Sequence, residues 1–193
     1  EHDRMTETIH NIRNIYYGEF GQGTKATIDD SGEQDSIPTP EYITWGDKLD
    51  FFYVQYDLKL SDRDDPSQNE ILLEVDRGKD SAKNLYTAFK KPIWIQTSYR
   101  SVEQSWKGSN FYKTGQIPEK DSQESSWNNH AYSGLDQARV IDEFLGLANK
   151  NTWIIGYSQP DYWQYDMPLL GDSSVRNKEA EDVWKRWNSI IFN

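Results

Sequence analysis

The chain has 193 residues, of which 35% are hydrophobic and 27% are charged, and it contains no cysteine. That length suits one ordinary domain, and the lack of thiols excludes disulfides, thiolate zinc sites and cysteine nucleophiles. The net charge of −11 argues against a non-specific polyanion binder, because neutralising phosphates requires clustered Lys and Arg. No apolar run could span a bilayer and no segment resembles a signal peptide, so we expect a cytoplasmic protein with no membrane segment.

Hydrophobic periodicity predicts an amphipathic helix over residues 5–17, followed by a surface loop at 29–40 that is rich in Asp, Ser, Gly and Pro. Apolar and polar residues then alternate through 49–60, which predicts a strand with one polar face. A solvated turn follows, and the short apolar run at 71–76 predicts a second strand. We expect these two strands to form an antiparallel pair.

The rest of the chain alternates helix and strand signals. Ser133, with Asp136 three residues later, resembles a capping box at the start of a helix. Residues 100–130 carry few aliphatic side chains and are expected to form a long loop or lid. The other expected elements are a helix from about Asp80 to before Pro92, a strand at 93–96, a helix at 133–148, a strand at 152–157 and a helix at 174–190. The fold class predicted for 1–193 is therefore a single α/β domain with a central mixed β-sheet flanked by helices.

Acidic residues in the two expected strands could form a metal site. Asp57 lies on the polar face of the first strand, and Glu74 and Asp76 would project from one face of the second, because residues two apart in a strand share a face. Like charges held together are unfavourable unless a cation neutralises them, and Mg²⁺ is the usual one. Such a cluster suits phosphodiester hydrolysis. The alternative is that these are ordinary acidic side chains on the solvent face of a half-exposed strand.

The run YDLKLSDRDDPSQNEILLEVDRGKDSAKNLYTAF resembles the active-site hairpin and following helix of BamHI-like type II restriction endonucleases, which have the PD-(D/E)xK nuclease fold. The family pattern is an Asp on one strand, then Glu-x-acid-x-Gly on the next, here Asp57, Glu74, Asp76 and Gly78. The stretch WIIGYSQPDYWQYDMPLLGDSSVRNKEAEDVWKRW is similar to the C-terminal part of that group. Residues 98–150 show no such likeness.

The resemblance implies a restriction-endonuclease-like core that cleaves double-stranded DNA site-specifically with Mg²⁺, as a homodimer about a two-fold axis. Its catalytic residues would be Asp57, Glu74, Asp76 and Glu41, and Asp57 and Glu74 would hold the metal. Asp76 stands where most enzymes of this fold carry Lys, so it would bind metal or accept the proton of water. The expected DNA contacts are Lys79, Lys83, Lys90, Lys91 and Arg100, with Arg139 more remote. Residues 135–148 offer a possible dimer surface, or a helix packed into its own core.

Two alternatives remain open from the sequence. Residues 97–101 resemble a Ser-x-Tyr-Arg-Ser stretch of zinc D-alanyl-D-alanine peptidases, with His130 and Asp136 or Asp142 near the expected metal ligands, but no third histidine follows. A non-enzymatic domain is the second alternative: a pilin-like subunit, a carbohydrate-binding module, or an acidic immunity or antirestriction protein. The aromatic side chains that could stack on sugars are those of Trp106, Tyr112, Trp127, Tyr162 and Trp163.

Overall fold

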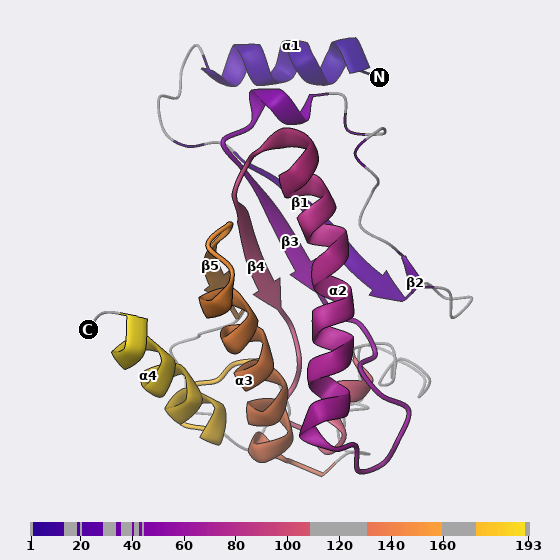
Figure 1. Cartoon of the computed structure of the whole chain (residues 1–193), viewed down its shortest axis with the longest axis vertical. Coiled ribbons are helices and arrows are strands. Elements are labelled where there is room, and N and C mark those ends of the chain that lie inside the picture. The colour runs from indigo at the N-terminus through magenta and orange to yellow at the C-terminus, as the bar shows by residue number, and fades with distance from the viewer. Residues whose placement is uncertain are drawn as a thin grey trace, which may run out of the picture.

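The computed structural model describes residues 2–13, 19, 21–28, 34–35, 40, 43, 45–108, 131–159 and 173–191. Its strands form one sheet in the order β2-β1-β3-β4-β5, in which β1, β3, β4 and β5 are parallel and β2 is antiparallel to β1 (Figure 1). The strands are β1 (Gly21–Ile28), β2 (Gln34–Asp35), β3 (Phe51–Tyr56), β4 (Ile93–Thr97) and β5 (Ile154–Ser158). The α-helices are α1 (His2–Arg13), α2 (Gln68–Phe89), α3 (Gly134–Lys150) and α4 (Glu179–Ile191).

Helices α2 and α3 lie together on one face of the sheet (Figure 1). Alternate residues of β3 and β4 are buried beneath them. The ring of Phe52 packs against Phe89 of α2 at a centroid distance of 5.3 Å, and that of Tyr56 against Phe144 of α3 at 5.6 Å. The opposite face of the strands, which we call the open face, has half-buried side chains. The sheet therefore has one face in the core and one face that is not covered by α2 or α3.

A single long helix, α2, occupies the region where a second strand was expected at 71–76, so that prediction is wrong. Ser67 caps the helix with a reciprocal capping box to Glu70, which satisfies backbone N–H groups that the first turn leaves free. The buried side chains are Ile71, Val75, Ala82 and Leu85. Their spacing follows the helical repeat of 3.6 residues rather than the strand repeat of two. The short apolar run at 71–75 is thus one part of a longer helical stripe.

The connection from β3 through α2 to β4 makes these strands parallel, so the expected antiparallel pair is also wrong. Val54 pairs with Ile95 in this parallel ladder, and α3 provides the same kind of connection from β4 to β5. Successive parallel strands joined by helices require crossovers of this length. As a consequence, the carboxyl ends of β3, β4 and β5 lie at one edge of the sheet.

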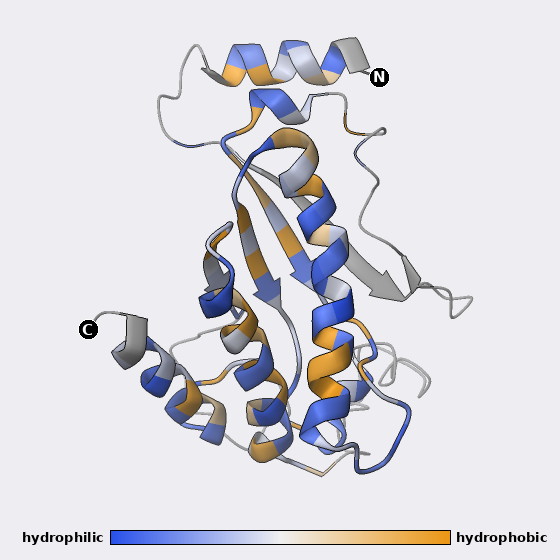
Figure 2. Ribbon diagram, viewed as in Figure 1, coloured by the Kyte–Doolittle hydropathy of each residue, from blue (hydrophilic) through white to orange (hydrophobic). Residues whose placement is uncertain are grey.

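The α/β class with a mixed sheet and flanking helices is confirmed, whereas a restriction-endonuclease-like core is not. The helix expected at 133–148 is α3, and the strands expected at 93–96 and 152–157 are β4 and β5. Their ends differ from the expected ones by a few residues. The apolar stripe at 135–148 packs into the protein's own core through residues such as Ile141 and Phe144, and the helices carry alternating apolar and polar bands (Figure 2). None of the helices in the described ranges combines the length and apolar character needed to cross a membrane.

Candidate functional site

A layer of uncharged polar side chains lies at the carboxyl edge of the open face. Gln55 of β3 pairs in register with Gln96 of β4, and Gln96 pairs with Ser158 of β5. The amide of Gln55 also donates a hydrogen bond of 3.5 Å to the hydroxyl of Ser98. All four side chains are half-buried. We call Gln55, Gln96, Ser98 and Ser158 the polar layer; it presents amide and hydroxyl groups from three neighbouring strands.

Aromatic side chains form the next layer of the open face, toward the amino ends of the strands. Trp94 donates a hydrogen bond from Nε1 to Ser158 Oγ at 3.0 Å, which ties this aromatic layer to the polar layer. Tyr53 pairs in register with Trp94, and partial burial raises the pKa of its hydroxyl despite a hydrogen bond to Ser158. The indole of Trp94 lies over Gly156, where a Cβ atom would meet the ring. These contacts fix the aromatic rings next to the polar layer, on the side toward the amino ends of the strands.

A buried hydrogen-bond network supports the same edge from the helix side of the sheet. Thr97, which is fully buried at the end of β4, shares a 2.5 Å hydrogen bond with the hydroxyl of Tyr157 and donates to Gln159 Oε1. Gln159 Nε2 in turn donates to the carbonyls of Tyr99 and Ser173 at 3.0 and 2.8 Å. Burial raises the pKa of Tyr157, so this hydroxyl stays protonated. The network fixes the carboxyl ends of β4 and β5 relative to each other.

Asp57 directly follows β3 and is only 4% exposed. Among the described residues within three positions of the carboxyl ends of β3, β4 and β5, it is the single acidic side chain. Tyr99, whose pKa is raised mainly by burial, is raised further by the negative charge of Asp57. Within the same distance of those ends lie two basic side chains, Lys59 and Arg100, so Asp57 is the one acidic group at this described part of the edge.

The expected carboxylate cluster does not form, because Glu74 and Asp76 lie on α2. Residues two apart on a helix point about 200° apart around its axis, so they do not share a face. Glu74 forms an ion pair with Arg77 at 2.7 Å, and Asp76 forms one with Lys79. In the described part of the chain, no group of three His, Cys, Asp or Glu side chains could hold a metal ion. Glu41 lies outside the described residues.

The expected DNA-contacting cations do not converge on one surface. Lys79 is engaged with Asp76, and the Nζ of Lys90 lies 5.9 Å from the ring centroid of Tyr86. Lys83 is exposed on α2, while Lys91 precedes β4 and Arg100 follows it, so these two are at opposite edges of the sheet. Arg139 packs over the ring of Trp106 at 4.8 Å from its centroid and hydrogen-bonds the Pro66 carbonyl. Lys79 and Lys83 are one turn apart on α2, but Lys91 and Arg100 lie at opposite ends of β4, so the five expected cations do not share one surface.

The residues of the alternative predictions are also placed elsewhere. Asp136 accepts a hydrogen bond from the backbone N–H of Gln104 at 2.8 Å, and Asp142 accepts one from Trp187 Nε1 at 2.6 Å. Trp106 is 2% exposed and donates to the Arg63 carbonyl, so it belongs to the core and offers no stacking surface. The other members of those sets lie outside the described residues: His130, Tyr112, Trp127, Tyr162 and Trp163.

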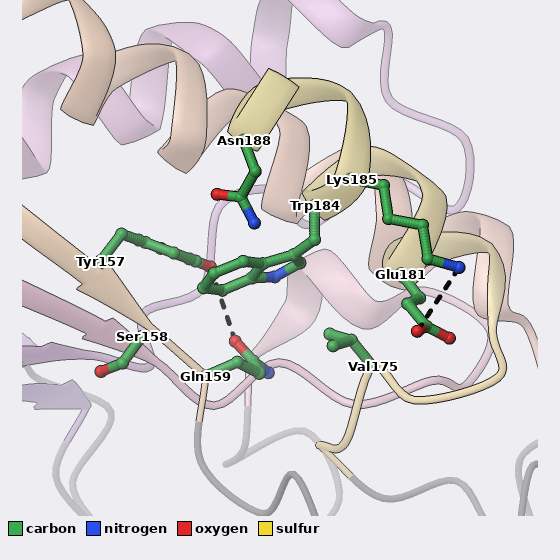
Figure 3. Close-up of a pocket in the computed structure, with 8 residues that line it drawn as sticks. All are labelled: Tyr157, Ser158, Gln159, Val175, Glu181, Trp184, Lys185 and Asn188. Carbon is green, nitrogen blue, oxygen red and sulfur yellow. Dashed lines mark hydrogen bonds and ion pairs between the residues drawn. The ribbon is translucent and has the colours of Figure 1, made fainter. Parts of the chain in front are cut away.

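A groove runs along β5 on the helix side. One pocket of about 460 Å³ lies at the carboxyl end of β5, and a second of about 280 Å³ continues along the strand; Tyr157, Trp184 and Asn188 line both. Figure 3 shows the indole of Trp184 across the first pocket beside Tyr157, with Gln159 and Val175 on one side and Asn188 on the other. We call this feature the edge groove.

The polar layer was missed because the strands were not expected to be parallel. The signal was present in the sequence: Gln55, Gln96 and Ser158 are polar residues near the carboxyl ends of apolar strands. In an α/β protein with parallel strands, ligands bind at that edge. Once β3, β4 and β5 are placed side by side, these polar positions identify the site.

No family model and no curated protein sequence matches this chain. Two solved structures do match its fold, one described as the structure of a GH113 β-1,4-mannanase and the other as a complex structure of a GH113 β-1,4-mannanase. Their TM-scores are 0.64 and 0.63, each at 18% sequence identity, and the matches cover 97% and 98% of this chain. The chain spans about half of each mannanase, 50% and 51% of their lengths.

This likeness overturns the predicted restriction endonuclease. The matched mannanases are TIM-barrel proteins, whereas the PD-(D/E)xK resemblance required a helix–strand–strand–strand–helix–strand core with an acidic hairpin. The described chain has sequential parallel β/α units instead. The predicted nuclease fold and the predicted DNA cleavage are wrong for one reason. The residues expected to form an acidic hairpin are the end of β3 and the first turns of α2. The DNA-cleaving function expected from that hairpin is withdrawn.

Proposed function

We propose that this protein binds a neutral saccharide at the carboxyl edge of the open face, through the polar layer. The observation that carries the proposal is the position of Gln55, Gln96 and Ser158 on adjacent parallel strands, at the edge where β/α barrels bind their substrates. The two solved structures that share this fold are described as β-1,4-mannanases. We therefore choose β-1,4-linked manno-oligosaccharides as the first ligands to test.

The chemistry of the edge fits a sugar better than an ionic ligand. Amide and hydroxyl groups both donate and accept hydrogen bonds, as sugar hydroxyls do. The polar layer carries no charge, and the aromatic layer below it, with Tyr53 and Trp94, supplies the apolar surface that the C–H face of a sugar ring contacts. A phosphate or carboxylate ligand would instead need cations at this position. The hydrogen-bonding groups of the polar layer itself are therefore matched to those of an uncharged, hydroxyl-rich molecule.

The described residues of the polar layer offer contacts for a saccharide and no catalytic pair of carboxyl groups. Most glycosidases use a pair of carboxyl groups on either side of the scissile bond, about 5–9.5 Å apart depending on mechanism. At the described carboxyl ends of β3, β4 and β5, Asp57 is the one carboxylate, and it is 4% exposed. Gln96 and Ser158 cannot act as general acids or nucleophilic carboxylates. The polar layer accordingly positions a saccharide without supplying the two catalytic groups.

Isothermal titration calorimetry with β-1,4-mannotetraose tests this function. Gln96→Ala and Gln55→Ala should each weaken binding by roughly tenfold, since each removes hydrogen bonds worth about 1 kcal/mol each. Gln68→Ala is the matched control, because Gln68 is an exposed glutamine at the start of α2, away from the open face. Equal affinities for all three variants, or no heat of binding with the wild type, would contradict the proposed site.

A further inference from the structure

Three side chains of the open face form a hydrogen-bonded chain that crosses the sheet from β3 to β5. Trp94 donates from Nε1 to Ser158 Oγ at 3.0 Å, and Tyr53 forms a hydrogen bond with the same serine. Tyr53 lies on β3 and Ser158 on β5, with β4 between them. Because neighbouring strands are about 4.8 Å apart, the ring of Tyr53 must reach over β4 to bring its hydroxyl to Ser158. We call Tyr53, Trp94 and Ser158 the donor chain.

Glycines stand on both sides of the two aromatic residues. In the register of the sheet, Gly23 of β1 pairs with Tyr53, Tyr53 with Trp94, and Trp94 with Gly156 of β5. A Cβ atom at residue 156 would be 2.5 Å from Trp94 Cε3. A side chain at that position would therefore push the indole away from β5 and from Ser158, two residues further along. The glycine thus allows the indole N–H and the phenol hydroxyl to meet at one serine.

The donor chain carries one hydrogen more than its own hydrogen bonds use. The indole N–H and the two hydroxyls supply three hydrogens, and two hydrogen bonds join the three groups. The indole can only donate, so its hydrogen is used on Ser158. The bond between Ser158 and Tyr53 uses one hydroxyl hydrogen, whichever residue donates it, and the other hydroxyl hydrogen points elsewhere. Partial burial raises the pKa of Tyr53, and the hydrogen bond with Ser158 offsets only part of that rise, so the phenol keeps its hydrogen at neutral pH.

The outward group of the donor chain is a donor in either arrangement. If Tyr53 donates to Ser158, both lone pairs of Ser158 Oγ are occupied and Ser158 donates outward; if Ser158 donates to Tyr53, the outward donor is Tyr53. Within the described part of the chain, neither hydroxyl has a further hydrogen-bond partner. A half-buried donor is satisfied best by an acceptor, so this position suits an acceptor oxygen of a bound molecule.

We propose that the donor chain binds an ether oxygen of the saccharide, either the glycosidic oxygen or the ring oxygen. This inference rests on the proposed saccharide site. Sugar hydroxyls both donate and accept, as do the amides of Gln55 and Gln96, whereas an ether oxygen can only accept. An ether oxygen is also flanked by C–H groups, which suits a position between the aromatic layer and the polar layer. The donor chain therefore recognises the atoms of a saccharide that the amides match less well.

Calorimetry with sulfur-substituted ligands tests this contact. The probes are β-1,4-mannotetraose and two analogues, one with sulfur in the glycosidic positions and one with sulfur in the rings, because sulfur is a weak acceptor. The wild type should bind one analogue about tenfold more weakly than the parent, and that analogue identifies the oxygen. The double variant Tyr53→Phe, Ser158→Ala should bind the parent more weakly and no longer distinguish it from the analogue. Tyr86→Phe is the matched control, since Tyr86 is a half-buried tyrosine of α2 that stacks on Trp153, and it should keep the discrimination.

Two calorimetric results would overturn the inference. The first is a wild type that binds both sulfur analogues as tightly as the parent, because no ether oxygen would then accept from the protein. The second is a folded double variant that keeps the discrimination, because the donor would then belong to another residue. Far-ultraviolet circular dichroism establishes that each variant is folded.

Nuclear magnetic resonance without saccharide tests the donor chain by itself. Ser158→Ala should raise the pKa of Tyr53 further, because the hydrogen bond with Ser158 lowers it, and should shift the indole N–H signal of Trp94. Isotope-labelled tyrosine and tryptophan report both, with Tyr53→Phe and Trp94→Phe assigning the signals. Unchanged signals in a folded Ser158→Ala variant would show that the donor chain does not exist. An intact donor chain in a wild type that binds no mannotetraose would instead contradict the proposed function, and the inference would fall with it.

Discussion

The indole of Trp94 lies against the backbone of Gly156 on the neighbouring strand, so close that a Cβ atom at residue 156 would be 2.5 Å from Trp94 Cε3. We therefore expect Gly156→Ala to destabilise the protein by about 1–3 kcal/mol, the usual cost of overpacking a filled site. Urea denaturation followed by circular dichroism measures this change. The same substitution in a Trp94→Ala background should cost much less, because the two residues share one contact.

Gly146→Ala is the control for that prediction. Gly146 lies inside α3, and a Cβ atom there would meet Trp187 Cζ2 at 3.5 Å, an ordinary van der Waals contact. Alanine is favoured over glycine in a helix by about 1 kcal/mol, so this variant should be more stable than the wild type. If Gly146→Ala and Gly156→Ala were equally destabilising, the close approach of Trp94 would not be the cause.

The capping box of α2 gives a second prediction. Ser67 accepts a hydrogen bond from the backbone N–H of Glu70, and the Glu70 carboxylate accepts one from the backbone N–H of Ser67. Ser67→Ala should lower the free energy of unfolding by about 1 kcal/mol, while Ser67→Asp should retain most of it because Asp is also a good N-cap residue. Chemical denaturation of both variants checks this. A loss as large with Asp as with Ala would show that the cap is not the source.

The pH dependence of stability provides the third prediction. The hydrogen bond from the Ser67 backbone, together with those from Arg63 and the Ser67 side chain, lowers the pKa of Glu70 from 4.5 to about 2. A carboxyl group whose pKa is lower in the folded state stabilises the fold above its unfolded pKa and loses that effect as the pH falls toward its folded pKa. The contribution of Glu70 should therefore disappear between about pH 4.5 and pH 2.

Glu70→Gln tests that window. The difference in unfolding free energy between wild type and variant should be constant above it and shrink as the pH falls through it. Glu74→Gln is a suitable comparison, because Glu74 lies on the same helix and also has an arginine partner, but not the capping role. High salt should reduce the part that comes from Arg63, since that pair is exposed. A Glu70 difference that does not vary with pH would contradict the lowered pKa.

Sequence reasoning found the elements whose signals are local. The alternation in β3, the apolar core of β4 and the Ser133 cap of α3 each depend on a few neighbouring residues, and each was placed within a few positions. β1 lies between the helix expected at 5–17 and the loop expected at 29–40, where no strand was expected. In the structure Gly21 is in β1, where a Cβ atom would meet the Phe51 ring at 2.4 Å, so that glycine permits close strand packing.

The site could not be predicted because its position depends on whether residues 71–75 form a helix or a strand. Residues 71–75 contain four apolar side chains in five positions, which fit a buried strand as well as a helix. The choice of a strand made β3 the first half of a hairpin and turned Glu74 and Asp76 into partners of Asp57. Ser67 and Glu70, three residues apart before this apolar run, were the signal for a helix. With α2 in place, β4 must be parallel to β3, and Gln55 and Gln96 become neighbours.

The fourth prediction concerns Gln137, which is fully buried in α3 and supports the carboxyl edge. Its Nε2 donates to the carbonyls of Tyr99 and Ser173 at 2.9 and 3.1 Å, and Gln159 Nε2 donates to the same two carbonyls. Gln137→Leu should cost about 1–3 kcal/mol, because it removes a buried donor from these acceptors. Gln159→Leu alone should lower the stability by a similar amount. In either single variant, the other glutamine still donates to both carbonyls.

The double variant Gln137→Leu, Gln159→Leu should lose more stability than the sum of the two single changes. In the double variant, neither glutamine donates a hydrogen bond to the carbonyls of Tyr99 and Ser173. A buried acceptor that has lost its hydrogen bonds lowers the stability of the fold. A double-mutant cycle in urea measures this coupling. Strict additivity would mean that the two glutamines act independently, and that the ends of β4 and β5 are held in place by the packing of Tyr99 and Tyr157 instead of by shared hydrogen bonds.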